Sequence, residues 1–94
     1  SDLRHHSQKF RVRMYYVYVL KSSKTGLLYK GQTDNLERRV QEHNAGKTSS
    51  TRHGIPWNIC YYEKHESRDA AITREKYFKT LRGCKELKKI MARM

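Results

Sequence analysis

Two charged side chains, Arg39 and Glu75, fall where the surrounding sequence predicts the apolar face of a helix. On the first helical segment Arg39 lies about 60° from Leu36, so it borders the side that faces the core. On the second segment Glu75 lies one turn from both Ala71 and Phe78. A domain with a stability of about 5–15 kcal/mol tolerates such burial only where the charges are paired or serve a function. The two residues therefore form an interhelical ion pair, extend to the solvent at the rim, or face an open site, where Arg39 binds a phosphate and Glu75 holds a cation.

Tyrosines on the preceding segments favour the open site. Tyr18 and Tyr29 come from two neighbouring stretches that are rich in aromatic and β-branched residues. A phenol can donate a hydrogen bond, accept one, or act as a base once it is deprotonated. Plain packing explains any one of these tyrosines. It does not explain two tyrosines together with an inward arginine and an inward glutamate in a strongly basic chain.

The strands that must position these tyrosines are short. Residues 15–20 and 27–33 favour two antiparallel strands joined by a polar turn, and residues 57–63 favour a third strand. Alternation along the first strand places Tyr18 on one face and Val17 on the other.

The helices are predicted from capping residues and from periodicity. Asp34, followed by Glu37 three residues later, resembles a capping box, and the helix it starts is expected to end near residues 44–46. The stretch 47–56 is polar and aperiodic, which predicts an exposed loop. Ser67 is expected to cap a second helix.

The C-terminal part of the chain is expected to hold two helices separated by a glycine. The inner side of the second helix runs from Ala71 to Arg82, Gly83 is expected to interrupt it, and residues 85–93 favour a short basic helix. The order β-β-α-β-α-α with three strands predicts the α+β class, a small antiparallel or mixed sheet with helices packed on it.

Charge points to an anionic partner. The 94 residues include 21 Lys and Arg against 9 Asp and Glu, a net charge of +12, and a chain of this length supports one core. In residues 1–13 four basic residues outweigh one acid, and this stretch is expected to be a basic flexible tail or an extended start upstream of Met14. That leaves +9 on the predicted domain, residues 14–94. Nucleic acid, DNA above all, is the expected partner.

Other features of the sequence indicate the compartment. The longest apolar run, Tyr15 to Leu20, has six residues where a membrane span needs about twenty, and no secretory signal is recognised. Cys60 and Cys84 form no CxxC motif and are expected to be reduced thiols. We therefore expect a soluble, cytoplasmic protein without a membrane partner.

The residues singled out above resemble those of the GIY-YIG nuclease superfamily. They are Tyr16-Val17-Tyr18, Tyr29-Lys30-Gly31 ten residues later, Leu36-Glu37-Arg38-Arg39-Val40 with His43-Asn44, the Gly-Ile-Pro-Trp stretch at 54–57, and Arg74-Glu75-Lys76. The resemblance covers about Met14 to Met91. It is closest to small stand-alone, single-domain members related to the N-terminal nuclease domain of the DNA-repair excinuclease.

This resemblance implies a fold and an activity. The fold is a three-stranded antiparallel sheet flanked by helices, and the activity is that of a metal-dependent endonuclease which hydrolyses DNA phosphodiester bonds in DNA repair or recombination. Single-domain members lack appended targeting domains. Low intrinsic specificity, or a protein partner that supplies targeting, is therefore expected.

The resemblance also assigns the catalytic residues. Tyr18 and Tyr29 stand at the two motif tyrosines, Arg39 at the catalytic arginine, and His43 at the polar position one turn later. Glu75 stands at the single metal-binding carboxylate, which implies one Mg²⁺ or Mn²⁺ ion. Hard cations of this kind prefer oxygen ligands and retain several waters.

The expected nucleic-acid contacts lie mostly outside this catalytic set. The glycine of the second motif is expected to let a phosphate approach the strand backbone. The full set of expected contacts is Lys30, Gly31, Arg38, Lys47, Arg52, Lys85, Lys88 and Lys89. Three departures from the family pattern stand out: Tyr16 replaces the first-motif glycine, Lys30 replaces the second-motif isoleucine, and no asparagine follows Glu75.

Several alternatives stay open at the level of sequence. Either Tyr18 or His43 can be the base, since the phenol pKa of about 10 must be lowered by nearby cations whereas an imidazole titrates near 6.5. The chain can instead be a catalytically silent nucleic-acid-binding domain. Two weaker alternatives are a zinc site built from His53, Cys60 and His65, and membrane-surface binding through the C-terminal basic helix.

Overall fold

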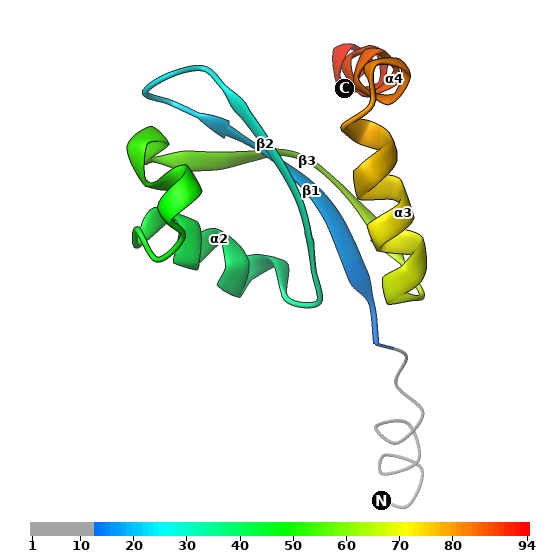
Figure 1. Cartoon of the computed structure of the whole chain (residues 1–94), viewed down its shortest axis with the longest axis horizontal. Coiled ribbons are helices and arrows are strands. Elements are labelled where there is room, and N and C mark those ends of the chain that lie inside the picture. Colours follow the sequence, from blue (N-terminus) through cyan, green and yellow to red (C-terminus); the bar gives the residue numbers. More distant parts are fainter. Residues whose placement is uncertain (1–12) are drawn as a thin grey trace, which may run out of the picture.

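The computed structural model describes residues 13–94, which form three strands, three α-helices and one 3₁₀ helix (Figure 1). The elements are β1 (Tyr15–Ser22), β2 (Leu28–Thr33), α2 (Leu36–Asn44), η1 (Ser49–Gly54), β3 (Trp57–His65), α3 (Arg68–Phe78) and α4 (Leu81–Ala92). This is the predicted α+β order. All but the last residue of the predicted basic tail lie outside the described residues.

The sheet is antiparallel throughout, with the strand order β2-β1-β3. The hairpin of β1 and β2 and its polar turn are as predicted, and β3 lies on the other side of β1. Tyr18, in the central strand, pairs with Gly31 of β2 and with Tyr62 of β3. The register between β1 and β3 shifts after Val19, where Cys60 is the extra residue on β3.

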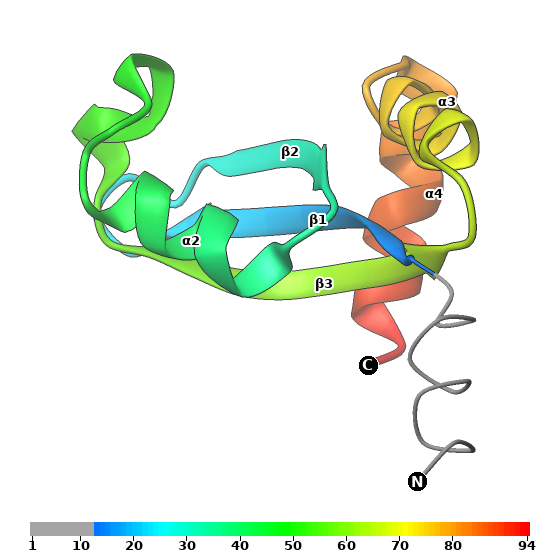
Figure 2. The same cartoon turned by 90° about the horizontal axis from the view of Figure 1, so that it is seen from below.

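The two faces of the sheet carry different helices, because side chains alternate along β1. Val17 and Val19 are buried on the face that carries α3 and α4, together with Ala71, Phe78 and Leu87. Tyr18, Leu20 and Trp57 are buried on the face that carries α2. Figures 1 and 2 show α2 and η1 toward one end of the sheet and α3 and α4 toward the other. The candidate tyrosine therefore belongs to the α2 core.

Helix α2 begins one residue later than predicted. Asn35 is its N-cap, because the Asn35 side chain accepts a hydrogen bond from the Arg38 backbone N–H at 3.0 Å. Asp34, which the capping-box spacing favoured, instead turns its carboxylate toward arginine side chains. The helix ends at Asn44 as predicted, and Gly46 follows with a φ of 77°, a conformation that glycine adopts readily.

The stretch expected to be an exposed loop contains a packed 3₁₀ helix, η1. Thr51 and Gly54 within it are buried. The Ser22 hydroxyl donates to the Gly54 carbonyl at 2.6 Å, and the Trp57 ring lies where a Cβ at position 54 would be. Such a segment has no apolar periodicity, because polar contacts and one aromatic neighbour hold it in place. The periodicity argument could not detect it.

The prediction that Gly83 separates two helices is wrong. Helix α3 ends at Phe78, and Thr80 caps α4, which contains both Arg82 and Gly83. A Cβ at position 83 would lie 1.8 Å from the Tyr77 carbonyl oxygen. Gly83 is buried at this junction, and its lack of a side chain lets α4 start directly against the end of α3.

Two further sequence-based expectations concern the membrane and the thiols. Among residues 13–94, no helix combines the length and the apolar character that crossing a membrane requires. Cys60 and Cys84 are both free, and the Cys60 thiol donates to the Val19 carbonyl. Burial raises the pKa of Cys60, so this thiol is a packing group.

Candidate active site

Tyr18 is the buried centre of the candidate site. Its side chain is only 1% exposed on the face of β1 that carries α2. The ring lies over Gly31 of β2, where a Cβ would come within 2.5 Å of the phenol oxygen. The space next to Gly31 is therefore taken by Tyr18. This corrects the expectation that the glycine opens the strand backbone to a phosphate.

A row of hydrogen bonds runs from Tyr18 into η1. The Tyr18 phenol oxygen lies 3.1 Å from His43 Nε2, and His43 Nδ1 lies 2.8 Å from Thr51 Oγ1. The Thr51 hydroxyl donates to the Thr48 carbonyl, so it accepts from the Nδ1–H of His43. In this tautomer His43 Nε2 carries the lone pair and accepts from the Tyr18 hydroxyl. His43 is thus oriented to receive the phenolic proton.

The protonation states of this row follow from burial. Burial raises the pKa of Tyr18 to about 12, although the neighbouring Arg39 guanidinium acts in the opposite direction. Burial lowers the pKa of His43, and the charge of Arg39 lowers it further. At neutral pH Tyr18 is a phenol and His43 a neutral imidazole.

Aromatic side chains enclose His43 and Thr51. Tyr29 comes from β2, and its ring centroid lies 4.8 Å from that of His43 and 6.3 Å from that of Tyr18. Trp57, at the start of β3, packs against Tyr29 edge-on, and its indole N–H donates to the Thr51 carbonyl at 2.7 Å. Trp57 therefore fixes the segment that orients His43.

Arg39 lies at the open edge of the site. Its side chain is 32% exposed, on the flank of α2 that faces Tyr18 and Tyr29. Nη1 donates to Glu42 Oε1 at 3.0 Å, and this hydrogen bond lowers the pKa of Glu42. Glu42 thereby holds the guanidinium at the mouth of the site, where its planar set of donors suits a phosphate.

Helix α3 brings Glu75 to the same space. Arg74, the residue before Glu75, fixes the rotation of α3. Its guanidinium donates to Glu63 of β3 at 3.1 Å and to Glu86 of α4 at 3.3 Å. Glu75, about 100° further round the helix, is half-buried and contributes to the rise of the Tyr18 pKa. Glu75 thus lies near enough for its charge to act on the Tyr18 phenol.

The interhelical ion pair that the sequence allowed is not formed in the described part of the chain. Arg39 pairs with Glu42, and Glu75 accepts from Lys79 Nζ at 2.8 Å, each within its own helix or at its end. Each of the two charges is thus paired locally.

Glu75 would be the one carboxylate ligand of a divalent cation here. Within residues 13–94 no three His, Cys, Asp or Glu side chains are grouped to hold a metal, which also disfavours the zinc alternative built on His53, Cys60 and His65. Mg²⁺ is often bound through one or two carboxylates, with waters and substrate phosphate completing its shell. The half-buried Glu75 suits such an ion once Lys79 leaves it.

Two of the expected nucleic-acid contacts donate to backbone carbonyls within the protein. Lys30 lies on the other face of the sheet, and its Nζ donates to the Phe78 carbonyl at 3.0 Å, at the C-terminus of α3. Arg52 Nε donates to the Gly46 carbonyl at 2.9 Å while the side chain stays exposed. Lys30 thus has a structural role that the sequence did not indicate.

The remaining expected contacts are exposed but lie in two places. Arg38 and Lys47 are exposed at opposite ends of the α2 region. The lysines of α4 are exposed on a helix that packs against the other face of the sheet; they are Lys85, Lys88 and Lys89. The fold does not bring the α4 lysines to Tyr18.

Three residues of the site were missed by sequence reasoning. Thr51 stands in a run of four hydroxyl residues, 48–51, and nothing in the sequence distinguishes it from the others. Trp57 was noted as part of a motif without a role. Glu42 could have been found, because its spacing from Arg39 places the two side chains together on a helix.

The chain resembles known proteins over most of its length. Residues 14–88 match the sequence model of the GIY-YIG catalytic domain. UPF0213 proteins of Streptococcus pyogenes serotype M5 (strain Manfredo) and serotype M3 (strain MGAS315) are each 44% identical over 66 residues, which is 68% of this chain and 70% of theirs. The solution NMR structure of a UPF0213 protein from Bacillus halodurans superposes with a TM-score of 0.52 at 28% identity, covering 82% of this chain and 84% of that one.

Proposed function

Since this chain belongs to the GIY-YIG catalytic domain family, we propose that it is a metal-dependent endonuclease that hydrolyses phosphodiester bonds in DNA. The strongest support is the buried row of Tyr18, His43 and Thr51, with Arg39 beside it and the charge of Glu75 acting on Tyr18. A role in DNA repair or recombination belongs to the same proposal.

The proton transfers follow the hydrogen-bonded row. The attacking water forms a bond to phosphorus while the bond to the leaving 3′-oxygen breaks, and that oxygen then takes a proton from solvent. Tyr18 takes a proton from the water as its own proton passes to His43 Nε2 across the 3.1 Å contact. Passing the proton on avoids a free buried phenolate, which a pKa of about 12 makes rare near neutral pH.

The charged groups act on the phosphate. Arg39 donates to the non-bridging oxygens, and this contact strengthens as negative charge develops on them. Glu75 would hold one Mg²⁺ or Mn²⁺ ion, which would polarise the phosphate and stabilise the charge on the leaving oxygen. Lys79 must release the Glu75 carboxylate for this to happen.

A catalytically silent nucleic-acid-binding domain is the second candidate. The ion pair between Glu75 and Lys79 favours it, because a carboxylate already neutralised by an ammonium group attracts a divalent cation less. Both candidates use the same basic surface, so DNA binding alone does not distinguish them, whereas DNA cleavage does.

The decisive test is cleavage of labelled duplex, single-stranded and branched DNA by the purified protein with Mg²⁺, Mn²⁺ or EDTA. We expect cleavage with either ion and none with EDTA. Glu75→Gln and Arg39→Ala should each lower the rate by about 100-fold or more. Lys76→Gln, an exposed neighbour of Glu75 on α3, is the matched control and should cleave at the original rate.

The outcomes separate the two candidates. DNA binding without cleavage under any of these conditions would identify the silent domain. Cleavage that survives EDTA, or that Glu75→Gln and Arg39→Ala leave unchanged, would come from a contaminating nuclease and would contradict the proposal.

A further inference from the structure

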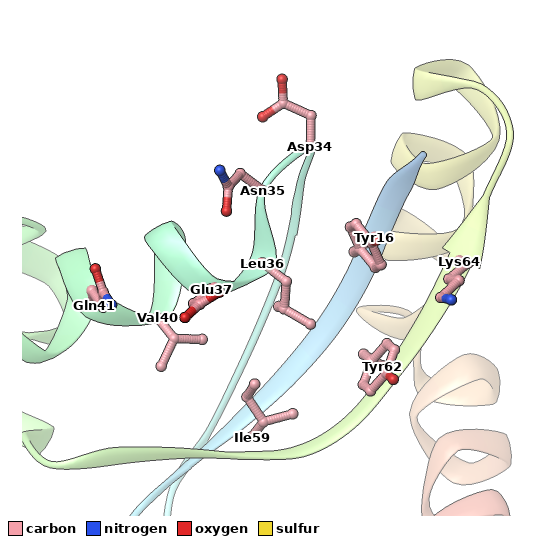
Figure 3. A pocket seen from close by; sticks show the side chains of 10 residues that line it. All are labelled: Tyr16, Asp34, Asn35, Leu36, Glu37, Val40, Gln41, Ile59, Tyr62 and Lys64. Carbon is pink, nitrogen blue, oxygen red and sulfur yellow. The ribbon is translucent and has the colours of Figure 1, made fainter. Parts of the chain in front are cut away.

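A groove of about 600 Å³ opens beside the candidate site, on the same face of the sheet (Figure 3). Its apolar lining consists of Tyr16, Leu36, Val40, Ile59 and Tyr62. It lies on the flank of α2 opposite the catalytic arginine. Of the α2 residues that line the groove, Glu37 and Gln41 lie about 160° from Arg39 around the helix, Val40 about 100° and Leu36 about 60°. The groove is therefore centred on another side of the helix than Arg39.

The groove exposes apolar and aromatic surface. Tyr62 is 48% exposed and Ile59 is 42% exposed. The rings of Tyr16 and Tyr62 lie 6.1 Å apart and are inclined by 58°, so Tyr62 presents part of its ring to the groove rather than stacking fully on its neighbour. An exposed surface of this kind marks a binding site more often than a packing defect. A flat ring is the shape that fits against it.

One end of the groove is cationic. Three exposed arginine side chains converge on the single carboxylate of Asp34; the nitrogen–oxygen distances are 3.4 Å for Arg13, 3.5 Å for Arg38 and 3.9 Å for Arg68. Arg38 also pairs with Glu42 at 3.8 Å, so three guanidinium groups share two carboxylates and positive charge remains in excess. Lys64 adds another positive charge at the β3 side. Guanidinium groups arranged in this way suit a phosphate.

The groove starts close to the reacting centre. Tyr62 is the cross-strand partner of Tyr18, so their Cβ atoms are about 5 Å apart, and Tyr16 lies about 7 Å along β1 from Tyr18. A strand held at the candidate site can therefore reach the groove within about one or two nucleotides. Polar side chains on the α2 wall, Glu37 and Gln41, can pair with the edge of a base.

We propose that this groove binds an unpaired nucleotide of the substrate, an inference that rests on the function proposed above. The base lies against Tyr62, and its phosphate lies at the arginine cluster around Asp34. The ligand is a nucleic acid and not a second copy, because each copy carries a net charge of +12 and would repel the other. The substrate class is then nucleic acid with an unpaired segment beside the cleaved bond, since a base inside a continuous duplex cannot leave its stack without cost.

The test measures binding without cleavage. Fluorescence anisotropy in EDTA compares a labelled oligodeoxythymidine with a blunt duplex, using the full chain and its variants. Tyr62→Ser should weaken binding of the single strand by about tenfold and leave duplex binding within about twofold. Tyr62→Phe keeps the ring and should bind like the original. Arg68→Gln should also weaken single-strand binding, and Leu81→Ser, an exposed residue on α4, is the control.

Each result decides the inference. Equal loss on both nucleic acids, or no loss with Tyr62→Ser, would overturn it. Tighter binding would mean that the substitution displaces another occupant, either a second copy or residues 1–12, and this result would also overturn the inference. Sedimentation velocity would identify a second copy. Selective loss without any DNA cleavage in the previous experiment would uphold the groove and contradict only the nuclease proposal.

Discussion

Tyr18 and His43 share one proton across a 3.1 Å contact, and this contact sets the pH dependence that we expect. His43 must be neutral to accept the proton, and burial lowers its pKa below the usual value of about 6.5. Cleavage should therefore be lost only as the pH falls below about 6.5, through the lowered pKa of His43. A pH–rate profile checks this, and an acid limb above that value would contradict it.

The same profile distinguishes the two possible bases. Tyr18→Phe and His43→Ala should both lower the cleavage rate by about 100-fold or more, because the water's proton passes through both groups. Loss of activity in the histidine variant alone would show that His43 takes the proton from water directly. The transfer through Tyr18 would then be wrong.

Thr51 sets the tautomer of His43, and its removal should affect both catalysis and stability. In Thr51→Val the buried Nδ1–H loses its acceptor, at a cost of about 1–3 kcal/mol. The cleavage rate should fall by about tenfold, because Nε2 then carries the proton in part of the population. Chemical denaturation and single-turnover rates measure the two effects.

The control for Thr51 is the conservative change. Thr51→Ser keeps the hydroxyl and should retain most of the activity and stability. Ser50→Ala, at the exposed neighbouring position, should change neither. A Thr51→Val variant with the original activity would mean that the histidine is oriented by other groups.

At the scale of the element, the close junction of α3 and α4 depends on the absence of a side chain at Gly83. Alanine is the better helix former by about 1 kcal/mol, yet Gly83→Ala should destabilise the protein by roughly 2 kcal/mol or more. Its Cβ would lie 1.8 Å from the Tyr77 carbonyl oxygen, so α4 must move away from α3. Urea denaturation measures the change in the free energy of unfolding.

The matched control for Gly83 lies two residues further along α4. Lys85→Ala is exposed and should stay within about 0.5 kcal/mol of the original. A Gly83→Ala variant that is as stable as the original would show that the junction adjusts at little cost.

Patterns along the chain predicted elements well wherever one local interaction decides them. The alternation of Tyr18 with Val17 predicted that the two residues lie on opposite faces of the sheet, and the cap at Ser67 is confirmed. The prediction failed at Gly83. A glycine is needed there because the backbone of α3 leaves no room for a side chain. It failed again in the stretch 47–56, where Thr51 is buried by contacts with residues distant in the fold rather than by an apolar stripe.

At the scale of the whole molecule, positive charge is spread over both faces of the sheet. The lysines of α4 are exposed on a helix that packs against the opposite face from Tyr18, and they are expected to hold the DNA backbone without touching the reacting bond. A triple variant in which Lys85, Lys88 and Lys89 are all changed to glutamine should bind duplex DNA more weakly at low salt. Its cleavage rate at saturating DNA should stay unchanged.

Salt dependence measures how many of these contacts form. The slope of log K against log salt concentration should fall by about 0.9 for each phosphate contact that the α4 variant loses. Lys24→Gln, exposed in the hairpin turn, serves as a single-charge comparison. An unchanged slope would show that α4 faces away from the bound DNA.

The sequence by itself determined the class of fold, the net charge of +12, and the motif that marks Tyr18, Arg39 and Glu75, because alternation, charge and short motifs are local properties of the chain. Only the tertiary structure decided what surrounds those residues. It placed the Tyr18 ring over Gly31 and brought Thr51 to His43. It also created the groove at Tyr62. These arrangements depend on which distant segments pack together, and no local pattern specifies that.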